Sequence, residues 1–233
     1  MGAQGQPMDV SNPGEIHLTR IFAVLLLVGM AAAWPHILAA QSPEQADDMV
    51  RVGDRWSFDS KDEITGFPKD TFTRVVTEVS PKEIVVSVTF RGKSGSSLVV
   101  YDHDWNRLEN SAWKYKSNDG QGIRPPLSVG KEWRYEFEAR NSQTGAASKT
   151  SGTSKILAQE MVTTPAGTFA TFKIETRKRE VSGADPSKSW EYENVGWYAP
   201  QINYWVRRTF LTKIQKRTSS NESEELISFD RKL

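Results

Sequence analysis

The chain has 233 residues, with 30 lysines and arginines against 29 aspartates and glutamates, and it contains no cysteine. This charge balance argues against nucleic acid as the main partner, because domains that bind nucleic acid carry clustered positive charge. Without cysteine the chain can form no disulfide, no thiol nucleophile and no lipid-modified cysteine. The sequence also has no phosphate loop, dinucleotide fingerprint or calcium loop.

The N-terminal segment has the layout of an export signal. Arg20 precedes an apolar run at 21–33, and the segment ends in the small residues Ala39 and Ala40. A basic residue, an apolar core and a small-residue end are typical of a secretory signal peptide. We therefore predict a signal helix at 1–40, cleaved after Ala40, a polar leader at 41–50, and a periplasmic or secreted protein. Because about 20 residues also suffice to span a bilayer, an uncleaved inner-membrane anchor is the alternative, and it would be the chain's only membrane attachment.

Beyond the signal, apolar and polar residues alternate with period two, and turn residues separate the alternating segments. No apolar stripe of helical period interrupts them. The pattern predicts an all-β, antiparallel domain, either a sandwich or an open barrel, with about eleven strands. The predicted strands are 56–60, 71–79, 83–91, 96–101, 111–116, 132–140, 150–160, 168–180, 189–198, 204–213 and 224–229.

The clearest local signal lies at 161–179, where two extended segments flank a turn. Pro165 presets φ at the first corner of the turn, and Gly167 can adopt the positive φ that closes it. From Thr168 onward, apolar residues alternate with polar ones. This stretch predicts a β-hairpin.

The chain also repeats part of itself. Residues 52–58 and 129–135 share a Val-Gly opening followed by aromatic residues at every second position. The segments that follow match in layout, so we predict an internal repeat of 52–116 and 129–215. No linker is long enough to require two domains. The two halves are therefore expected to share one core in a single β domain at 51–233.

Most aromatic residues fall on the predicted strands. They can fill the space between curved sheets, or they can line a pocket for an apolar or sugar ligand. The candidate ligand-binding residues are Trp133, Tyr135, Trp197, Tyr198 and Trp205.

Three short basic runs lie at 177–179, 207–208 and 213–217, each among acidic neighbours. Such runs are typical of a solvated strand face, and contact with an anionic surface is the alternative.

Residues 125–215 resemble a group of uncharacterised bacterial exported β proteins, the DUF-type families. The resemblance rests on a Val-Gly-x-x-Trp-x-Tyr opening at 129–135, a Pro-Ala-Gly-Thr-Phe hairpin at 165–169 and a closing Trp-Tyr-Ala-Pro at 197–200. It implies an envelope location and an antiparallel β fold, but no activity and no functional residue. Where those families have a glycine after the last motif, this chain has Asn203, which can also adopt positive φ.

Two groups of residues are candidates for catalysis. Asp102, His103 and Asp104 could perform acid–base chemistry or hold a metal, although a polar turn explains them more simply. Glu191 and Glu193 have the spacing of a carboxylate pair for glycoside hydrolysis, although alternation with aromatic residues is also typical of a solvated outer face.

From these observations we predict a non-catalytic binding or scaffold module of the cell envelope. Its partner would be an apolar small molecule or an envelope protein, and we predict neither a cofactor nor a metal. The alternative is a hydrolase acting on envelope glycans or esters. The sequence leaves the oligomeric state open.

Overall fold

The computed structural model describes residues 49–231, which belong to the second of two compact units, Ser42–Leu233. The predicted signal at 1–40 and nearly all of the predicted leader lie outside the described residues. Within residues 49–231, no helix has both the length and the apolar character needed to cross a membrane.

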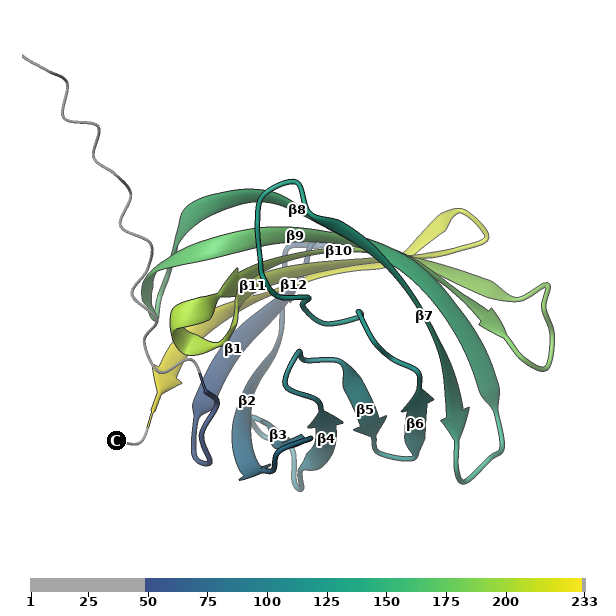
Figure 1. The fold of residues 1–233 in the computed structure, drawn as a ribbon, viewed down its shortest axis with the longest axis horizontal. Helices are drawn as coiled ribbons and strands as arrows, with labels where there is room; N and C mark the ends of the chain where they lie inside the picture. The colour runs from purple at the N-terminus through teal and green to yellow at the C-terminus, as the bar shows by residue number, and fades with distance from the viewer. Residues whose placement is uncertain (1–48, 232–233) are drawn as a thin grey trace, which may run out of the picture. The chain divides into compact units, whose positions relative to one another are not determined.

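Twelve antiparallel strands form a closed barrel in the described part of the chain (Figure 1). Each strand pairs with the strands before and after it in the sequence, and β1 pairs with β12. A single turn of 3-10 helix, η1 (Pro200–Ile202), separates β10 from β11. The strands are β1 (Arg55–Asp62), β2 (Pro68–Val79), β3 (Ile84–Phe90), β4 (Ser97–Tyr101), β5 (Arg107–Asn110), β6 (Trp113–Lys116), β7 (Glu132–Asn141), β8 (Ala147–Thr164), β9 (Gly167–Ser182), β10 (Ser189–Ala199), β11 (Tyr204–Ile214) and β12 (Arg217–Asp230).

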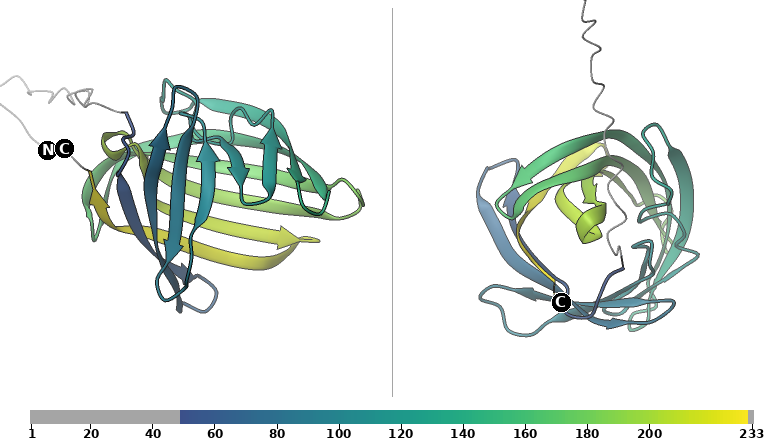
Figure 2. Two further views of the ribbon diagram at one scale, coloured as in Figure 1. Left: turned by 90° about the horizontal axis from the view of Figure 1, so that it is seen from below. Right: turned by 60° about the vertical axis from the view of Figure 1, so that its left-hand side comes forward.

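The predicted all-β antiparallel fold is confirmed, and the sheet takes the form of a barrel that closes on itself. Closure comes from the pairing of the first strand with the last, which runs from Arg55 opposite Asp230 to Asp62 opposite Glu222. Figure 2 shows the resulting ring of strands from one end. Closure removes the two free edges that an open sheet would expose.

The predicted hairpin is confirmed. β8 ends at Thr164 and β9 begins at Gly167, so only Pro165 and Ala166 connect them. Gly167 has φ +134°, the positive value expected of the residue that closes this turn. The pair continues as far as Ser148 opposite Ser182, with one register shift between Ile156 and Ala158, and it forms one long wall of the barrel.

Strand alternation places one side chain in two inside the barrel. On β7, Trp133, Tyr135 and Phe137 are buried, whereas the residues between them are exposed. At one end of the barrel, Trp56 stacks on Tyr204 with ring centroids 4.6 Å apart, and neither ring is appreciably exposed. Large aromatic rings therefore fill much of the interior.

The two segments of the predicted repeat have the same local geometry at the start of β1 and β7. Gly53 has φ +95° and donates its N–H to the carbonyl oxygen of Val76 over 2.8 Å. Gly130 has φ +87° and donates its N–H to the carbonyl oxygen of Ile156 over 2.9 Å. This likeness supports the repeat, which stays a prediction.

Candidate functional site

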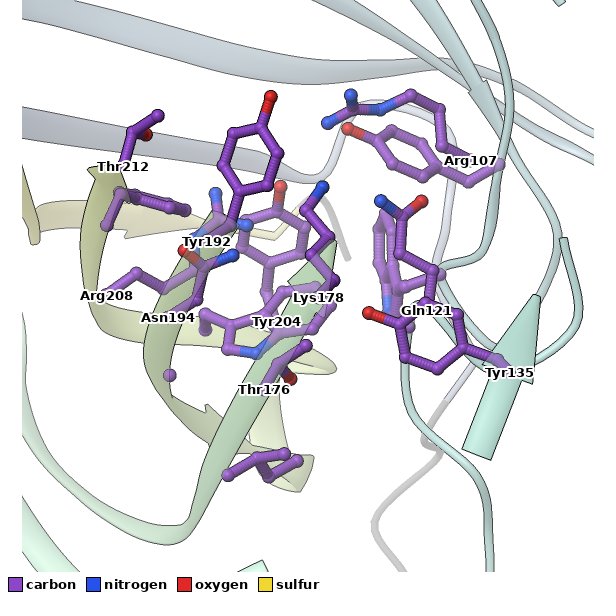
Figure 3. Close-up of a pocket in the computed structure, with 17 residues that line it drawn as sticks. Arg107, Gln121, Tyr135, Thr176, Lys178, Tyr192, Asn194, Tyr204, Arg208 and Thr212 are labelled. Atoms are coloured by element: carbon purple, nitrogen blue, oxygen red, sulfur yellow. The ribbon is translucent and has the colours of Figure 1, made fainter. Parts of the chain in front are cut away.

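A cavity of about 320 Å³ lies inside the barrel (Figure 3). Its walls come from β4, β5, β7, β9, β10 and β11 and from the connections between β4 and β5 and between β6 and β7. Aromatic and polar side chains share the lining. They include Tyr101, Trp105, Arg107, Gln121, Tyr135, Ile174, Thr176, Lys178, Tyr192, Asn194, Tyr204, Trp205, Arg208, Phe210 and Thr212.

Three aromatic rings form an apolar wall of the cavity. The rings of Trp105 and Tyr204 meet edge to face with centroids 4.7 Å apart, and those of Tyr204 and Trp205 do so at 5.2 Å. Gly196 on β10 makes room for the indole of Trp205, because a Cβ at Gly196 would lie 2.7 Å from the indole Cδ1. Any larger residue at position 196 would displace this wall.

Tyr135 packs against a glycine of the neighbouring strand. A Cβ at Gly152 on β8 would lie 2.5 Å from the Tyr135 Cζ, so the ring packs directly on the strand backbone. The buried hydroxyl of Tyr135 has no hydrogen-bond partner among the described residues. Burial raises the pKa of Tyr135, so the hydroxyl keeps its proton and can donate a hydrogen bond.

A buried asparagine helps to hold the connection between β6 and β7 in place. Asn106 is 1% exposed, and its Oδ1 accepts the N–H groups of Gly120 and Gly122 over 2.8 and 2.9 Å. The Trp133 indole donates to the carbonyl oxygen of Gly120 over 2.7 Å. These bonds position Gln121 in the cavity wall.

Asn203 has φ +48°, so it adopts the positive φ that asparagine allows in place of glycine. Its Oδ1 also accepts the Trp105 indole N–H over 3.0 Å and the Tyr198 hydroxyl over 2.6 Å. A glycine would allow the same backbone but offer no acceptor. Asparagine therefore both turns the chain after η1 and orients an aromatic wall of the cavity.

A buried charge cluster lies beside the cavity. Arg208, which lines the cavity, forms an ion pair with Glu224 on β12, and Arg74 on β2 lies 3.6 Å from the same carboxylate. Burial opposes ionisation of Glu224, but Arg208 and Arg74 outweigh it and lower the pKa of the carboxyl group.

Arg107 and Lys178 bring two further positive charges to the cavity (Figure 3). The Lys178 ammonium lies 4.5 Å from the centroid of the Tyr192 ring. Enclosure in the barrel and the nearby Arg107 lower the pKa of Lys178 to about 8. Most Lys178 side chains are still charged at neutral pH.

The structure brings two of the five aromatic candidates into the cavity wall, Tyr135 and Trp205. Trp133 and Tyr198 are buried beside the cavity, where they hold neighbouring segments in place. Trp197 lies on the outer side of β10, and its indole donates a hydrogen bond to a glutamate on β8.

The Asp102–Asp104 candidates form a tight turn. Asp102 Oδ1 accepts the backbone N–H groups of Asp104 and Asn106 over 3.0 and 2.8 Å. His103 is exposed, and its Nε2 lies 2.8 Å from the carbonyl oxygen of Ser80. Burial, and then the nearby Asp102, raise the pKa of Asp104. None of the three candidates lines the cavity.

The second catalytic candidate pair lies on the outer face of the barrel. Glu191 and Glu193 alternate on β10 with Tyr192, whose ring lines the cavity. Glu193 forms an ion pair with Lys213, and Glu191 is exposed. Across residues 49–231, no cluster of three or more histidine or carboxylate side chains could hold a metal ion.

The charged residues of the cavity were not predicted from the sequence. Lys178 lies within the basic run assigned to a solvated face, and its two neighbours in that run are indeed exposed. The alternation of Ile174, Thr176 and Lys178 carried the signal, because these positions share the inward side of β9. Arg107 had no such signal, because β5 was not among the predicted strands.

No family model matches the chain, and no curated protein matches it either. Among solved structures, a predicted exported protein of Bacteroides fragilis with a YmcC-like fold is 17% identical, with a TM-score of 0.50 over 78% of this chain and 97% of that one. A predicted lipoprotein of Parabacteroides distasonis is 14% identical, with a TM-score of 0.48 over 77% and 96%. The hypothetical lipoprotein YmcC of Escherichia coli is 9% identical, with a TM-score of 0.46 over 80% and 89%. The first of these likenesses indicates a shared fold.

Proposed function

We propose that this chain is an exported, non-catalytic binding module that takes the apolar part of a small ligand into its barrel. The cavity of about 320 Å³ carries the proposal. Its volume is near the lower end of the range of about 300–1,000 Å³ that is usual for small-molecule sites. The wall formed by Trp105, Tyr204 and Trp205 offers the apolar contact that such sites provide.

Export is supported by the signal-like layout of residues 1–40. The fold shared with a predicted exported protein of Bacteroides fragilis is in keeping with it. A small-molecule ligand is favoured over a protein partner, because the cavity lies inside the closed ring of strands. The hydrolase alternative lacks comparable support, since His103, Glu191 and Glu193 all lie away from the cavity.

Filling the cavity tests the proposal. Asn194 lies on the cavity wall and makes no side-chain hydrogen bond with the described residues, so Asn194→Trp places a large ring in the space without breaking a bond. We expect this variant to bind the neutral fluorescent probe N-phenyl-1-naphthylamine at least about tenfold more weakly than the natural protein, a loss of about 1.4 kcal/mol. Fluorescence titration measures the dissociation constants.

Glu191→Trp is the matched control, because it adds the same ring to the outer face of the same strand. This control should bind the probe like the natural protein. Equal binding by all three proteins would place the probe outside the cavity and overturn the proposal. Native mass spectrometry of protein exported by a bacterial host then determines whether a ligand is already bound.

A further inference from the structure

The side chains that line the cavity carry a net positive charge. Its lining includes Arg107, Lys178 and Arg208 but no aspartate or glutamate. Glu224 neutralises Arg208 from behind the wall. Within residues 49–231, neither Arg107 nor Lys178 has a carboxylate at ion-pair distance. Two enclosed positive charges without an ion-pair partner are unfavourable, because burial removes part of their hydration.

The cavity wall also contains two hydrogen-bond donors without acceptors. The Nε of Arg107 and the hydroxyl of Tyr135 are buried, and neither has a partner among the described residues. Buried polar atoms in native proteins are nearly always hydrogen-bonded. Both atoms are donors at neutral pH, so the group that would satisfy them is an acceptor.

The surroundings of Lys178 do not supply an ion-pair partner. Arg107 faces it from β5, and the ring of Tyr192 faces it from β10. Glu180, on the same strand, is the nearby carboxylate: its charge raises the pKa of Lys178 but is outweighed, it forms no ion pair with the ammonium, and its Oε2 accepts the Tyr192 hydroxyl over 3.1 Å. Enclosure and Arg107 lower the pKa of Lys178, which is the effect expected of a cation that lacks an anion.

We propose that the ligand is an amphiphile with an oxyanion head, a carboxylate or a phosphate, which Arg107 and Lys178 bind while the aromatic wall holds the apolar part. This inference rests on the proposed function and names its ligand class. A guanidinium group matches an oxyanion with two parallel hydrogen bonds, and an ammonium group adds a compact charge. The aromatic residues Trp105, Tyr204 and Trp205 lie in the same cavity as both cations.

Calorimetric titration with four amphiphiles of equal chain length tests the proposal. These are dodecanoate, dodecyl phosphate, dodecanol and dodecyltrimethylammonium, each below its micelle concentration or, for dodecanol, its solubility limit. We expect at least one of the two anions to bind about tenfold or more tightly than dodecanol, and the cation to bind most weakly. A preference between the two anions shows whether the head group is a carboxylate or a phosphate.

The variants Arg107→Gln and Lys178→Gln should each lose the preference for the anion and still bind dodecanol. Arg179→Gln is the matched control, because it removes one positive charge from the exposed side of β9 next to Lys178. This control should keep the preference. If a cavity variant fails to fold, the melting temperature of the natural protein still decides the question, since dodecanoate or dodecyl phosphate should raise it more than dodecanol does.

The possible failures are distinguishable. Equal affinity for dodecanol and both anions, unchanged by Arg107→Gln and Lys178→Gln, would overturn the oxyanion head group and leave the proposed binding module standing. If Arg179→Gln also loses the preference for the anion, that preference comes from the surface charge of the protein. This result would overturn the proposed oxyanion site. No binding of any of the four amphiphiles, together with no binding of N-phenyl-1-naphthylamine, would remove the proposed function itself.

Discussion

Glu224 is the carboxylate that allows two arginines to lie inside the barrel. It is 6% exposed, forms an ion pair with Arg208 and lies 3.6 Å from Arg74. Arg74 also packs over the ring of Phe72, with its guanidinium carbon 4.6 Å from the ring centroid. The carboxylate and the rings together compensate for the lost hydration of the arginines.

Replacing Glu224 by glutamine should destabilise the protein by about 3–5 kcal/mol, because it leaves buried positive charge uncompensated. The two arginines hold the folded-state pKa of Glu224 below its ordinary value of 4.5. The stabilisation is therefore fully present above that unfolded value and is lost as pH falls through the folded pKa. Urea unfolding of both proteins at a series of pH values should show the difference between them shrinking below about pH 4.5.

Glu222→Gln is the control for this experiment. Glu222 lies on the same strand, and its ion pair with Lys69 is largely exposed, so its loss should change stability by less than about 1 kcal/mol. Equal effects of the two substitutions, or a Glu224 effect that persists unchanged into acid, would show that the buried carboxylate does not have the role described.

At the scale of the strand, period-two alternation was enough to predict most of the barrel. β7 has a buried residue at every second position, and its predicted range of 132–140 lies within the observed strand. β5 was missed because it is only four residues long and all four are partly buried. Alternation also fixes the inward side of a strand, but a charged residue such as Lys178 on that side runs against the expectation that charges face solvent.

The connections between strands were harder to predict than the strands. Asn106 accepts two backbone N–H groups of the loop between β6 and β7, and no local pattern in the sequence pairs a residue at position 106 with glycines at 120 and 122. The cavity depends on such long-range contacts. The aromatic residues that line the cavity were predicted in part, through Tyr135 and Trp205, and its charged residues were not.

Asn106→Ala tests how this loop is held. The change removes the acceptor of two backbone N–H groups in a buried place, so it should cost about 2–3 kcal/mol in stability. Amide hydrogen exchange should rise at Gly120 and Gly122 before it rises in the strands. Asn110→Ala on β5, where the asparagine makes no side-chain hydrogen bond with the described residues, should leave exchange in the loop unchanged. Unchanged exchange in both variants would show that the loop is held by other contacts.

At the scale of the whole barrel, the first and last strands of the domain contact each other. β1 pairs with β12, and the side chain of Arg231 forms two hydrogen bonds with the buried Asp54, at 3.1 and 2.9 Å. Because every other pairing joins successive strands, any hairpin turn could in principle serve as the chain ends.

A circular permutant tests this view of the barrel. Joining residue 231 to residue 49 with a short Gly-Ser linker and opening the exposed turn at 142–146 keeps every strand pairing. We expect this permutant to fold to the same circular-dichroism spectrum, with stability reduced by no more than about 2 kcal/mol. A second permutant opened at Thr176, inside β9, breaks a central strand and should not fold. Equal behaviour of the two permutants would contradict the role given to strand continuity.

Because β1 pairs with β12, the protein should resist aggregation only when its last strand is in place. Until Arg217–Asp230 is in place, β1 and β11 each present a row of unpaired backbone N–H and carbonyl groups. Such edges can add strands from other chains. A chain that stops before Arg217 therefore keeps most of the strands and loses the feature that keeps copies of the barrel apart, so truncation there should produce edge-to-edge polymers instead of a smaller barrel.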